Sequence, residues 1–208
     1  MAWGGAAAAE EVVIAALGDS LTQGYGLPAD QGFVPQMQAW LDAAGADVRL
    51  INAGVSGDTT AGGAARLAWT LTDDVDGLIV TLGGNDFLRG IPPEVSRANL
   101  DAILAGAAAA GVDVLLVGME ATGNYGPDYK AAFDAMYPEL AEVHGALHAP
   151  SFFAGLDAAA EEDRSAAIAR YMQPDGIHPN ADGVALIVEA LGPYVLELAE
   201  RARSEPES

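Results

Sequence analysis

The stretch Val12-Val13-Ile14-Ala15-Ala16-Leu17-Gly18-Asp19-Ser20-Leu21-Thr22 begins as an unbroken apolar run and then turns polar at Gly18. A short continuous apolar run of this kind is typical of a strand buried in a parallel sheet. Open α/β sheets bind their ligands beyond the carboxyl ends of the strands. The stretch therefore predicts that the hydroxyl of Ser20 lies at the mouth of a sheet, and we interpret Ser20 as a candidate nucleophile.

Strand-like and helix-like segments alternate along the rest of the chain. The further predicted strands are 47–52, 77–82, 112–119 and, more weakly, 149–153. Apolar residues at helical spacing predict helices at about 33–45, in the segment that contains 64–71, at about 93–110, in a segment that ends near Gly145, and at about 181–203. This alternation predicts a three-layer α/β/α architecture with a five-stranded parallel sheet. We expect a single domain over residues 1–208, with loose ends at about 1–10 and 204–208.

Composition limits the classes of partner. The chain has 208 residues and a net charge of −21, from 9 Lys and Arg against 30 Asp and Glu. Nucleic acid and anionic lipid surfaces carry negative charge and would be repelled, so neither is an expected partner. The chain contains no cysteine, which excludes disulfides, thiolate metal sites and a cysteine nucleophile. No apolar run approaches the roughly 18 residues that a membrane span needs, so we expect no stable membrane insertion.

The first ten residues bear on the compartment. They are rich in small residues and have no basic segment. We interpret them as the end of a removed signal peptide or as a frayed terminus. The first interpretation favours a periplasmic or secreted protein, and the alternative is a cytoplasmic one. We expect a monomer or a weak homo-oligomer.

Four polar loops contain the residue types that acyl transfer requires. They are Asp19-Ser20, Ser56-Gly57-Asp58, Gly84-Asn85-Asp86 and the segment from Asp175 to His178. The first three follow predicted strands, so they meet at one edge of the sheet. Acyl transfer needs a nucleophile, a base, a group that orients the base, and donors for the oxyanion. An Asp three residues before a His allows one tight turn to bring the carboxylate to the imidazole, which fixes its tautomer.

Two other interpretations were considered. His144 and His148 are four residues apart, which is a metal-binding spacing on a helix, but no third ligand is evident and we expect no metal site. Ser56 is a rival nucleophile. Its surroundings lack the second glycine of the G-x-S-x-G elbow, and so do those of Ser20, which argues against an ordinary α/β-hydrolase. Taken singly, each of the four loops is more often a plain turn than a catalytic segment. Their coincidence favours catalysis.

The four loops resemble a known family. The blocks Gly18-Asp19-Ser20-Leu21, Gly57, Gly84-Asn85-Asp86 and Asp175-Gly176-Ile177-His178-Pro179 are similar, in order and context, to the four sequence blocks of the GDSL, or SGNH, hydrolases. Within that family, the stretches 52–59, 82–86 and 124–126 are most similar to the bacterial multifunctional thioesterase I/arylesterase/lysophospholipase group. The resemblance implies the flavodoxin-like SGNH hydrolase fold and a reaction that needs no cofactor.

The resemblance also assigns roles to residues. It implies that Ser20 is the nucleophile, His178 the base and Asp175 the residue that orients the base. The oxyanion donors would be the backbone N–H groups of Ser20 and Gly57 and the side-chain amide of Asn85. Without a Cβ, Gly57 allows a substrate to approach its N–H closely, and the amide of Asn85 donates without losing a proton.

Other residues are expected to brace the loops or to contact substrate. We interpret Asp19 and Asp86 as acceptors for loop N–H groups, and Asp19 also adjoins the substrate as the neighbour of Ser20. The segment 87–91 resembles the mobile loop of related thioesterases, with Gly90 as a hinge. The expected substrate contacts are Asp19, Phe87, Leu88, Ile91, Met119, Tyr125 and Ile177. Plain packing is an equally good interpretation for Tyr125 and Met119, and Met172 is either a second wall or part of the core.

Together these observations predict a serine esterase that acts through an acyl-serine intermediate. Expected substrates are aryl and short-to-medium-chain esters, with thioesters and lysophospholipids as further small-molecule substrates. The negative charge of the chain disfavours strongly anionic substrates. Two alternatives remain open: a carbohydrate acetylesterase, and, from a different class, a catalytically inactive acyl-binding module.

Overall fold

The computed structural model describes residues 11–160 and 164–203, and the predicted loose ends lie outside these ranges. Its centre is one parallel sheet in the order β2-β1-β3-β4-β5. The strands are β1 (Val12–Gly18), β2 (Val48–Gly54), β3 (Gly77–Thr81), β4 (Asp113–Val117) and β5 (Leu147–Ala149). The five-stranded parallel sheet is confirmed, and its order is the flavodoxin-like one.

The first strand is central in the sheet. β1 pairs with β2 on one side and with β3 on the other, so that Ala16 lies between Asn52 and Ile79. All seven residues of β1 are buried. A strand covered on both faces has no polar face, which explains the unbroken apolar run that begins at Val12.

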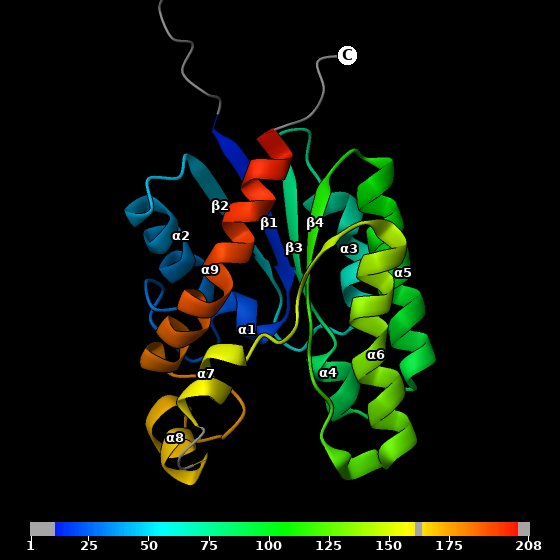
Figure 1. The fold of residues 1–208 in the computed structure, drawn as a ribbon, viewed down its shortest axis with the longest axis vertical. Coiled ribbons are helices and arrows are strands. Elements are labelled where there is room, and N and C mark those ends of the chain that lie inside the picture. Colours follow the sequence, from blue (N-terminus) through cyan, green and yellow to red (C-terminus); the bar gives the residue numbers. More distant parts are fainter. Residues whose placement is uncertain (1–10, 161–163, 204–208) are drawn as a thin grey trace, which may run out of the picture.

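Helices cover both faces of the sheet. α2 (Phe33–Ala43) and α9 (Ala181–Arg203) lie on one side, and α3 (Thr60–Thr70), α5 (Pro93–Ala109) and α6 (Pro127–His144) lie on the other (Figure 1). The three layers predicted from the alternating pattern are therefore confirmed. Among the described helices, none is both long and apolar enough to cross a membrane.

Two predictions along the chain were wrong in detail. The fifth strand covers Leu147–Ala149 rather than 149–153, because the chain turns at Pro150 and crosses the end of β4, where the N–H of Phe152 donates to the carbonyl of Gly118 at 2.9 Å. Phe152 is fully buried by this crossing, so its apolar character did not indicate a strand. Four short helices of the described chain were not predicted: α1 (Ser20–Gln23), α4 (Gly84–Leu88), α7 (Ala154–Ala159) and α8 (Arg164–Tyr171).

Short helices follow the carboxyl ends of two strands. β1 leads into α1 (Ser20–Gln23), and β3 leads into α4 (Gly84–Leu88). Both lie at the end of the sheet opposite to the start of β1 and the end of α9 (Figure 1). Between β4 and α6, one 3₁₀ turn covers Gly123–Tyr125. The loops that carry the candidate residues thus gather at the edge where parallel sheets place their sites.

Candidate active site

Ser20, His178 and Asp175 form a continuous hydrogen-bonded chain. Nε2 of His178 lies 2.8 Å from Oγ of Ser20, and Nδ1 of His178 lies 2.7 Å from Oδ2 of Asp175. Ser20 is the first residue of α1, so its N–H has no acceptor within that helix. With a carboxylate on one ring nitrogen and a hydroxyl on the other, the imidazole is oriented to take the hydroxyl proton.

A tight turn from Asp175 to His178 brings the carboxylate to the imidazole, although the two residues are three positions apart. Oδ1 of Asp175 accepts from the backbone N–H groups of Ile177, at 2.9 Å, and His178, at 3.0 Å. Gly176 has φ +68°, which a residue with a side chain rarely adopts. The hydrogen bonds from the backbone and the side chain of His178, together with that from Ile177, lower the pKa of Asp175 to about 2. The carboxylate is therefore ionised at neutral pH.

Tyr25 and Gln173 support the imidazole, and the sequence analysis did not single them out. The ring centroid of Tyr25 lies 4.7 Å from that of His178. Nε2 of Gln173 donates to the carbonyl of Tyr25 at 2.8 Å and to that of Pro179 at 3.0 Å. A Cβ on Gly26 would lie 2.2 Å from Oε1 of Gln173. In the sequence, only the glycines on either side of Tyr25 mark this segment, and glycines alone indicate a loop and not a contact with His178.

Asn85 is held by the residue that precedes the candidate nucleophile. Its Nδ2 donates to Oδ2 of Asp19 at 3.1 Å, and Oδ1 of Asp19 accepts from the N–H of Leu21 at 3.0 Å. Asp19 is only 2% exposed, so the structure places it behind Asn85 and supports its bracing role. Burial raises the pKa of Asp19 to about 6, against the lowering effect of its two hydrogen bonds.

Asp86 braces the neighbouring helices, in agreement with its predicted role. Its fully buried carboxylate accepts from the N–H of Thr60 at 2.8 Å and from Oγ of Ser96 at 2.9 Å. It thereby connects α4 to the starts of α3 and α5. Asn85 directly precedes Asp86. Its position is therefore fixed by its own hydrogen bond to Asp19 and by the hydrogen bonds of Asp86.

Gly57 lies in an exposed turn after β2, closed by a hydrogen bond from the N–H of Asp58 to the carbonyl of Val55 at 3.0 Å. Its φ is +83°. Within the described ranges, no group accepts a hydrogen bond from the Gly57 N–H. The rival nucleophile Ser56 donates instead to Oε1 of Gln23 at 2.9 Å. Ser56 therefore lacks the contact with a histidine that Ser20 has.

Comparison with known proteins agrees with this geometry. The model of the GDSL-like Lipase/Acylhydrolase family matches residues 16–186. The chain belongs to that family. Esterase TesA of Pseudomonas aeruginosa is 37% identical over 193 residues, which are 92% of this chain and 90% of the relative. Thioesterase 1/protease 1/lysophospholipase L1 of Escherichia coli (strain K12) is 35% identical over 185 residues, with coverage of 88% and 82%.

A solved structure shares the fold of this GDSL-like hydrolase. The crystal structure of AlinE4, an SGNH-hydrolase family esterase, has a TM-score of 0.71 and 39% identity. The match covers 92% of this chain and 98% of AlinE4. The chain is thus a carboxylic ester hydrolase of the SGNH fold.

The apolar residues expected around substrate divide into exposed and buried ones. Leu88, Tyr125 and Ile177 are about half exposed, at 53%, 48% and 46%. Phe87 is partly buried and its ring meets that of Tyr125 edge-on, with the centroids 5.8 Å apart. Ile91 is also partly buried.

Two methionines lie farther inside than the substrate-contact interpretation requires. Met119 is 4% exposed and belongs to the hydrophobic core, where it follows β4. Met172 is half-buried and packs against the core. An apolar residue just after a buried strand continues the core, which supports the packing interpretation for Met119.

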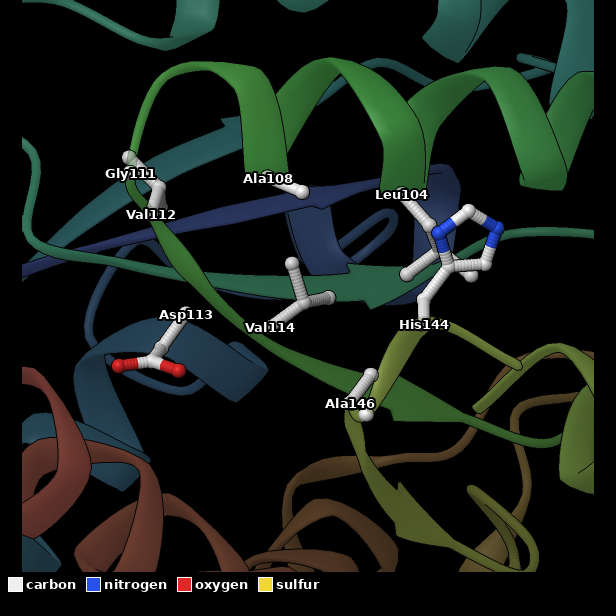
Figure 2. A pocket seen from close by; sticks show the side chains of 9 residues that line it. Leu104, Ala108, Gly111, Val112, Asp113, Val114, His144 and Ala146 are labelled. Atoms are coloured by element: carbon white, nitrogen blue, oxygen red, sulfur yellow. The ribbon is translucent and has the colours of Figure 1, made fainter. Parts of the chain in front are cut away.

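The hollow beside Ser20, the candidate nucleophile of this GDSL-like hydrolase, is small. It has a volume of about 10 Å³, and its lining includes Ser20, Tyr25, Leu27 and His178. A hollow of about 220 Å³ lies at the opposite edge of the sheet, between the ends of α5 and α6 and the start of β4 (Figure 2). The larger hollow is therefore remote from the reacting groups, and we place the substrate on the open surface beside Ser20.

The two other histidines do not converge. His144 pairs with Oδ1 of Asp101 at 2.7 Å, and in Figure 2 its ring and the carboxylate of Asp113 point in different directions. Nε2 of His148 is buried without a partner. Within the described part of the chain, no group of three His, Cys, Asp or Glu side chains is placed to hold a metal ion.

Proposed function

We propose that this hydrolase cleaves neutral carboxylic esters through an acyl intermediate on Ser20. The observation that carries the proposal is the hydrogen-bonded chain from Asp175 through His178 to Ser20. In this proposal the side-chain amide of Asn85 and the backbone N–H groups of Gly57 and Ser20 stabilise the oxyanion.

The proposed reaction has two halves. Oγ of Ser20 attacks the ester carbonyl carbon while His178 takes the hydroxyl proton, and negative charge develops on the carbonyl oxygen. His178 then gives that proton to the leaving alkoxide or phenoxide, the ester bond breaks and the acyl group remains on Ser20. Water, deprotonated by His178, attacks the acyl-serine. The acid leaves and Ser20 recovers its proton.

Substrate class is inferred from the surroundings of Ser20. The half-exposed side chains of Leu88, Tyr125 and Ile177 supply apolar surface near the site, which suits aryl and short-to-medium alkyl groups. A hollow of about 10 Å³ does not enclose a long acyl chain. The net charge of −21 disfavours strongly anionic substrates. The name of the Escherichia coli relative includes thioesterase and lysophospholipase, so neutral thioesters and lysophospholipids are further proposed substrates.

We also propose a cellular compartment and an oligomeric state for the protein. The small residues of segment 1–10 support a periplasmic or secreted protein, with a cytoplasmic one as the alternative. We propose that the protein acts as a monomer or a weak homo-oligomer, with no nucleic-acid partner.

Replacing the nucleophile tests the proposal. Ser20→Ala should fold normally and lose hydrolysis of p-nitrophenyl acetate and butyrate. The matched control is Ser56→Ala, which removes an exposed serine hydroxyl nearby and should retain activity. Activity that survives in Ser20→Ala, or disappears in Ser56→Ala, contradicts the assignment.

A side-by-side substrate panel separates the alternatives. Palmitoyl-CoA, lysophosphatidylcholine and acetylated xylan are compared with p-nitrophenyl esters. Preference for acetylated xylan would favour a carbohydrate acetylesterase. Binding of acyl compounds with no turnover of any ester would favour the acyl-binding module.

A further inference from the structure

Arg66 bonds to three separate segments of the chain. It lies on α3, and its Nη2 donates to the carbonyl of Gly18 at 2.8 Å. Its Nη1 donates to the carbonyl of Ala53 at 2.6 Å, and its Nε pairs with Oδ2 of Asp58, also at 2.6 Å. The side chains of Arg66 and Asp58 are only 21% and 18% exposed. One planar guanidinium, with its donors in a fixed fork, therefore sets the relative position of three acceptors.

The three acceptors flank the proposed reacting groups. Gly18 ends β1 two residues before Ser20, and Asp58 directly follows Gly57. The guanidinium thus links the turn that carries the nucleophile to the turn that carries a proposed oxyanion donor. Gly57 is exposed and has φ +83°, and a glycine there has wide conformational freedom. A restraint from outside the turn is needed to hold its N–H in one place.

The first turns of α3 are shaped to admit the carboxylate that Arg66 binds. A Cβ on Gly62 would lie 2.1 Å from Oδ1 of Asp58. Any side chain at position 62 would push Asp58 away from the guanidinium. The ion pair therefore depends on two residues of α3: Arg66 supplies the cation, and Gly62 leaves room for the carboxylate of Asp58.

Two further contacts join the same turns to α4. Nη2 of Arg89, the residue directly after α4, donates to the carbonyl of Gly57 at 2.7 Å. Asp19 holds Asn85 at 3.1 Å. The segments that carry the three proposed oxyanion donors are thus linked in pairs, and Arg66 makes the link between the turn of Ser20 and the turn of Gly57.

We propose that Arg66 is a positioning residue that keeps the Gly57 N–H in register with Oγ of Ser20 and with Asn85. The inference rests on the proposed function, because it presumes that Gly57 donates to the oxyanion. Arg66 does not touch the reacting atoms. Its contribution is to fix a donor before the reaction, and donors that need no reorganisation stabilise the transition state more than the bound substrate.

A purely structural role for Arg66 makes different predictions. If the ion pair only stabilised the fold, its loss would lower Tm and leave the turnover of the folded fraction unchanged. A misplaced oxyanion donor lowers kcat and leaves KM nearly unchanged, since the substrate carbonyl binds the donor weakly before charge develops. It also weakens the binding of a trifluoromethyl ketone, which forms a tetrahedral adduct, as much as it lowers kcat.

The experiment compares Arg66→Lys and Asp58→Asn with a matched control. Arg66→Lys keeps the charge and loses the fork, and Asp58→Asn is isosteric and leaves the bonds from Arg66 to the two carbonyls. The control is Arg97→Gln, which removes an exposed arginine paired with Glu139 at 2.6 Å on the outside of the molecule. For each variant, kcat and KM with p-nitrophenyl acetate, the Ki of a trifluoromethyl ketone and Tm are measured.

Arg66→Lys should lower kcat by about 10- to 100-fold, the range expected when a catalytic donor is displaced. KM should change little, and the Ki should rise by the same factor as kcat falls. Asp58→Asn should show the same pattern at smaller amplitude, and Arg97→Gln should behave as wild type.

Unchanged kcat in both site variants, or an effect on KM alone, overturns the proposal. If Arg66→Lys does not fold at the assay temperature, Asp58→Asn decides by the same criteria. Loss of ester hydrolysis in Ser20→Ala bears on the proposed function separately. An inactive Ser20→Ala together with normal kcat in the Arg66 and Asp58 variants would refute only the positioning role.

Discussion

The buried carboxylate of Asp19 holds the amide of Asn85 at 3.1 Å. The residue next to the proposed nucleophile thereby supports a group on a different strand-to-helix connection. The same carboxylate is costly to ionise, because burial raises its pKa to about 6. The ionised carboxylate at position 19 therefore lowers the stability of the fold, while its hydrogen bond fixes the position of Asn85.

Replacing Asp19 by Asn should separate these two effects. The folded-state pKa of about 6 lies above the ordinary pKa of an aspartate, 3.8. The contribution of Asp19 to stability is therefore greatest below about pH 4 and declines as pH rises through 6. Relative to wild type, Tm of Asp19→Asn should increase by a few degrees from pH 4 to pH 8, since each kcal/mol shifts Tm by about 2–4 °C in a chain of this length. A difference in Tm that does not vary with pH would contradict this expectation.

The same variant should be less active. Asn has one acceptor oxygen where Asp19 uses two, for Leu21 and Asn85, so Asn85 loses its anchor in part of the population. We expect kcat to fall by about tenfold at pH 8, below the effect of removing a donor outright. Steady-state kinetics with p-nitrophenyl acetate measure this. Wild-type kcat would show that Asn85 is held without Asp19.

Removing the amide itself should have the larger effect. Asn85→Ala deletes one proposed oxyanion donor, and the loss of one such donor costs about 10²–10³ in kcat. KM should be nearly unchanged, because the donor acts mainly on the charge that develops in the transition state. A change confined to KM would remove Asn85 from the oxyanion hole.

The ring of Tyr25 should matter more than its hydroxyl. Its centroid lies 4.7 Å from that of the His178 imidazole, so the ring limits the tilt of the base. Tyr25→Ala should lower kcat by several-fold to about tenfold, within the range for a slightly misoriented group. Tyr25→Phe keeps the ring and serves as the matched control, with activity near that of wild type. Equal losses in both variants would assign the effect to the hydroxyl.

His148 should weaken the fold in acid. Desolvation lowers its pKa below 6.5, and its Nε2 is buried without a partner. The unfolded chain therefore binds a proton more readily, and the stability that the neutral ring permits is retained above pH 6.5 and lost as pH falls below it. His148→Leu should reduce the fall in Tm between pH 7 and pH 5. Identical pH dependence in variant and wild type would show that the pKa of His148 is the same in the folded and the unfolded chain, and would contradict this prediction.

Local patterns predicted much of this protein. The apolar run before Ser20 gave the central strand, and the three-residue spacing of Asp175 and His178 predicted a contact that the structure places at 2.7 Å. Contacts between distant segments could not be read in the same way. Arg66 was an ordinary helical arginine in the sequence, because its acceptors at Gly18 and Ala53 are backbone carbonyls that no residue type marks.

Apolar residues near strand ends were difficult to assign from sequence. Met119 and Phe152 are apolar residues close to strand ends, and the sequence does not show whether such a residue faces a substrate or continues the core. Both are buried because the chain crosses over the end of β4. Only the path of the backbone after Pro150 settles the question.

The separation of 158 residues between Ser20 and His178 has a consequence for synthesis. On a ribosome the hydroxyl emerges early and remains without its base until nearly all of the described chain has been made. A nascent chain that ends before residue 178 contains the residues of all five strands, yet it lacks both the imidazole of His178 and helix α9, which packs against the sheet. Esterase activity should therefore appear late, after translation has passed the last loop of the site.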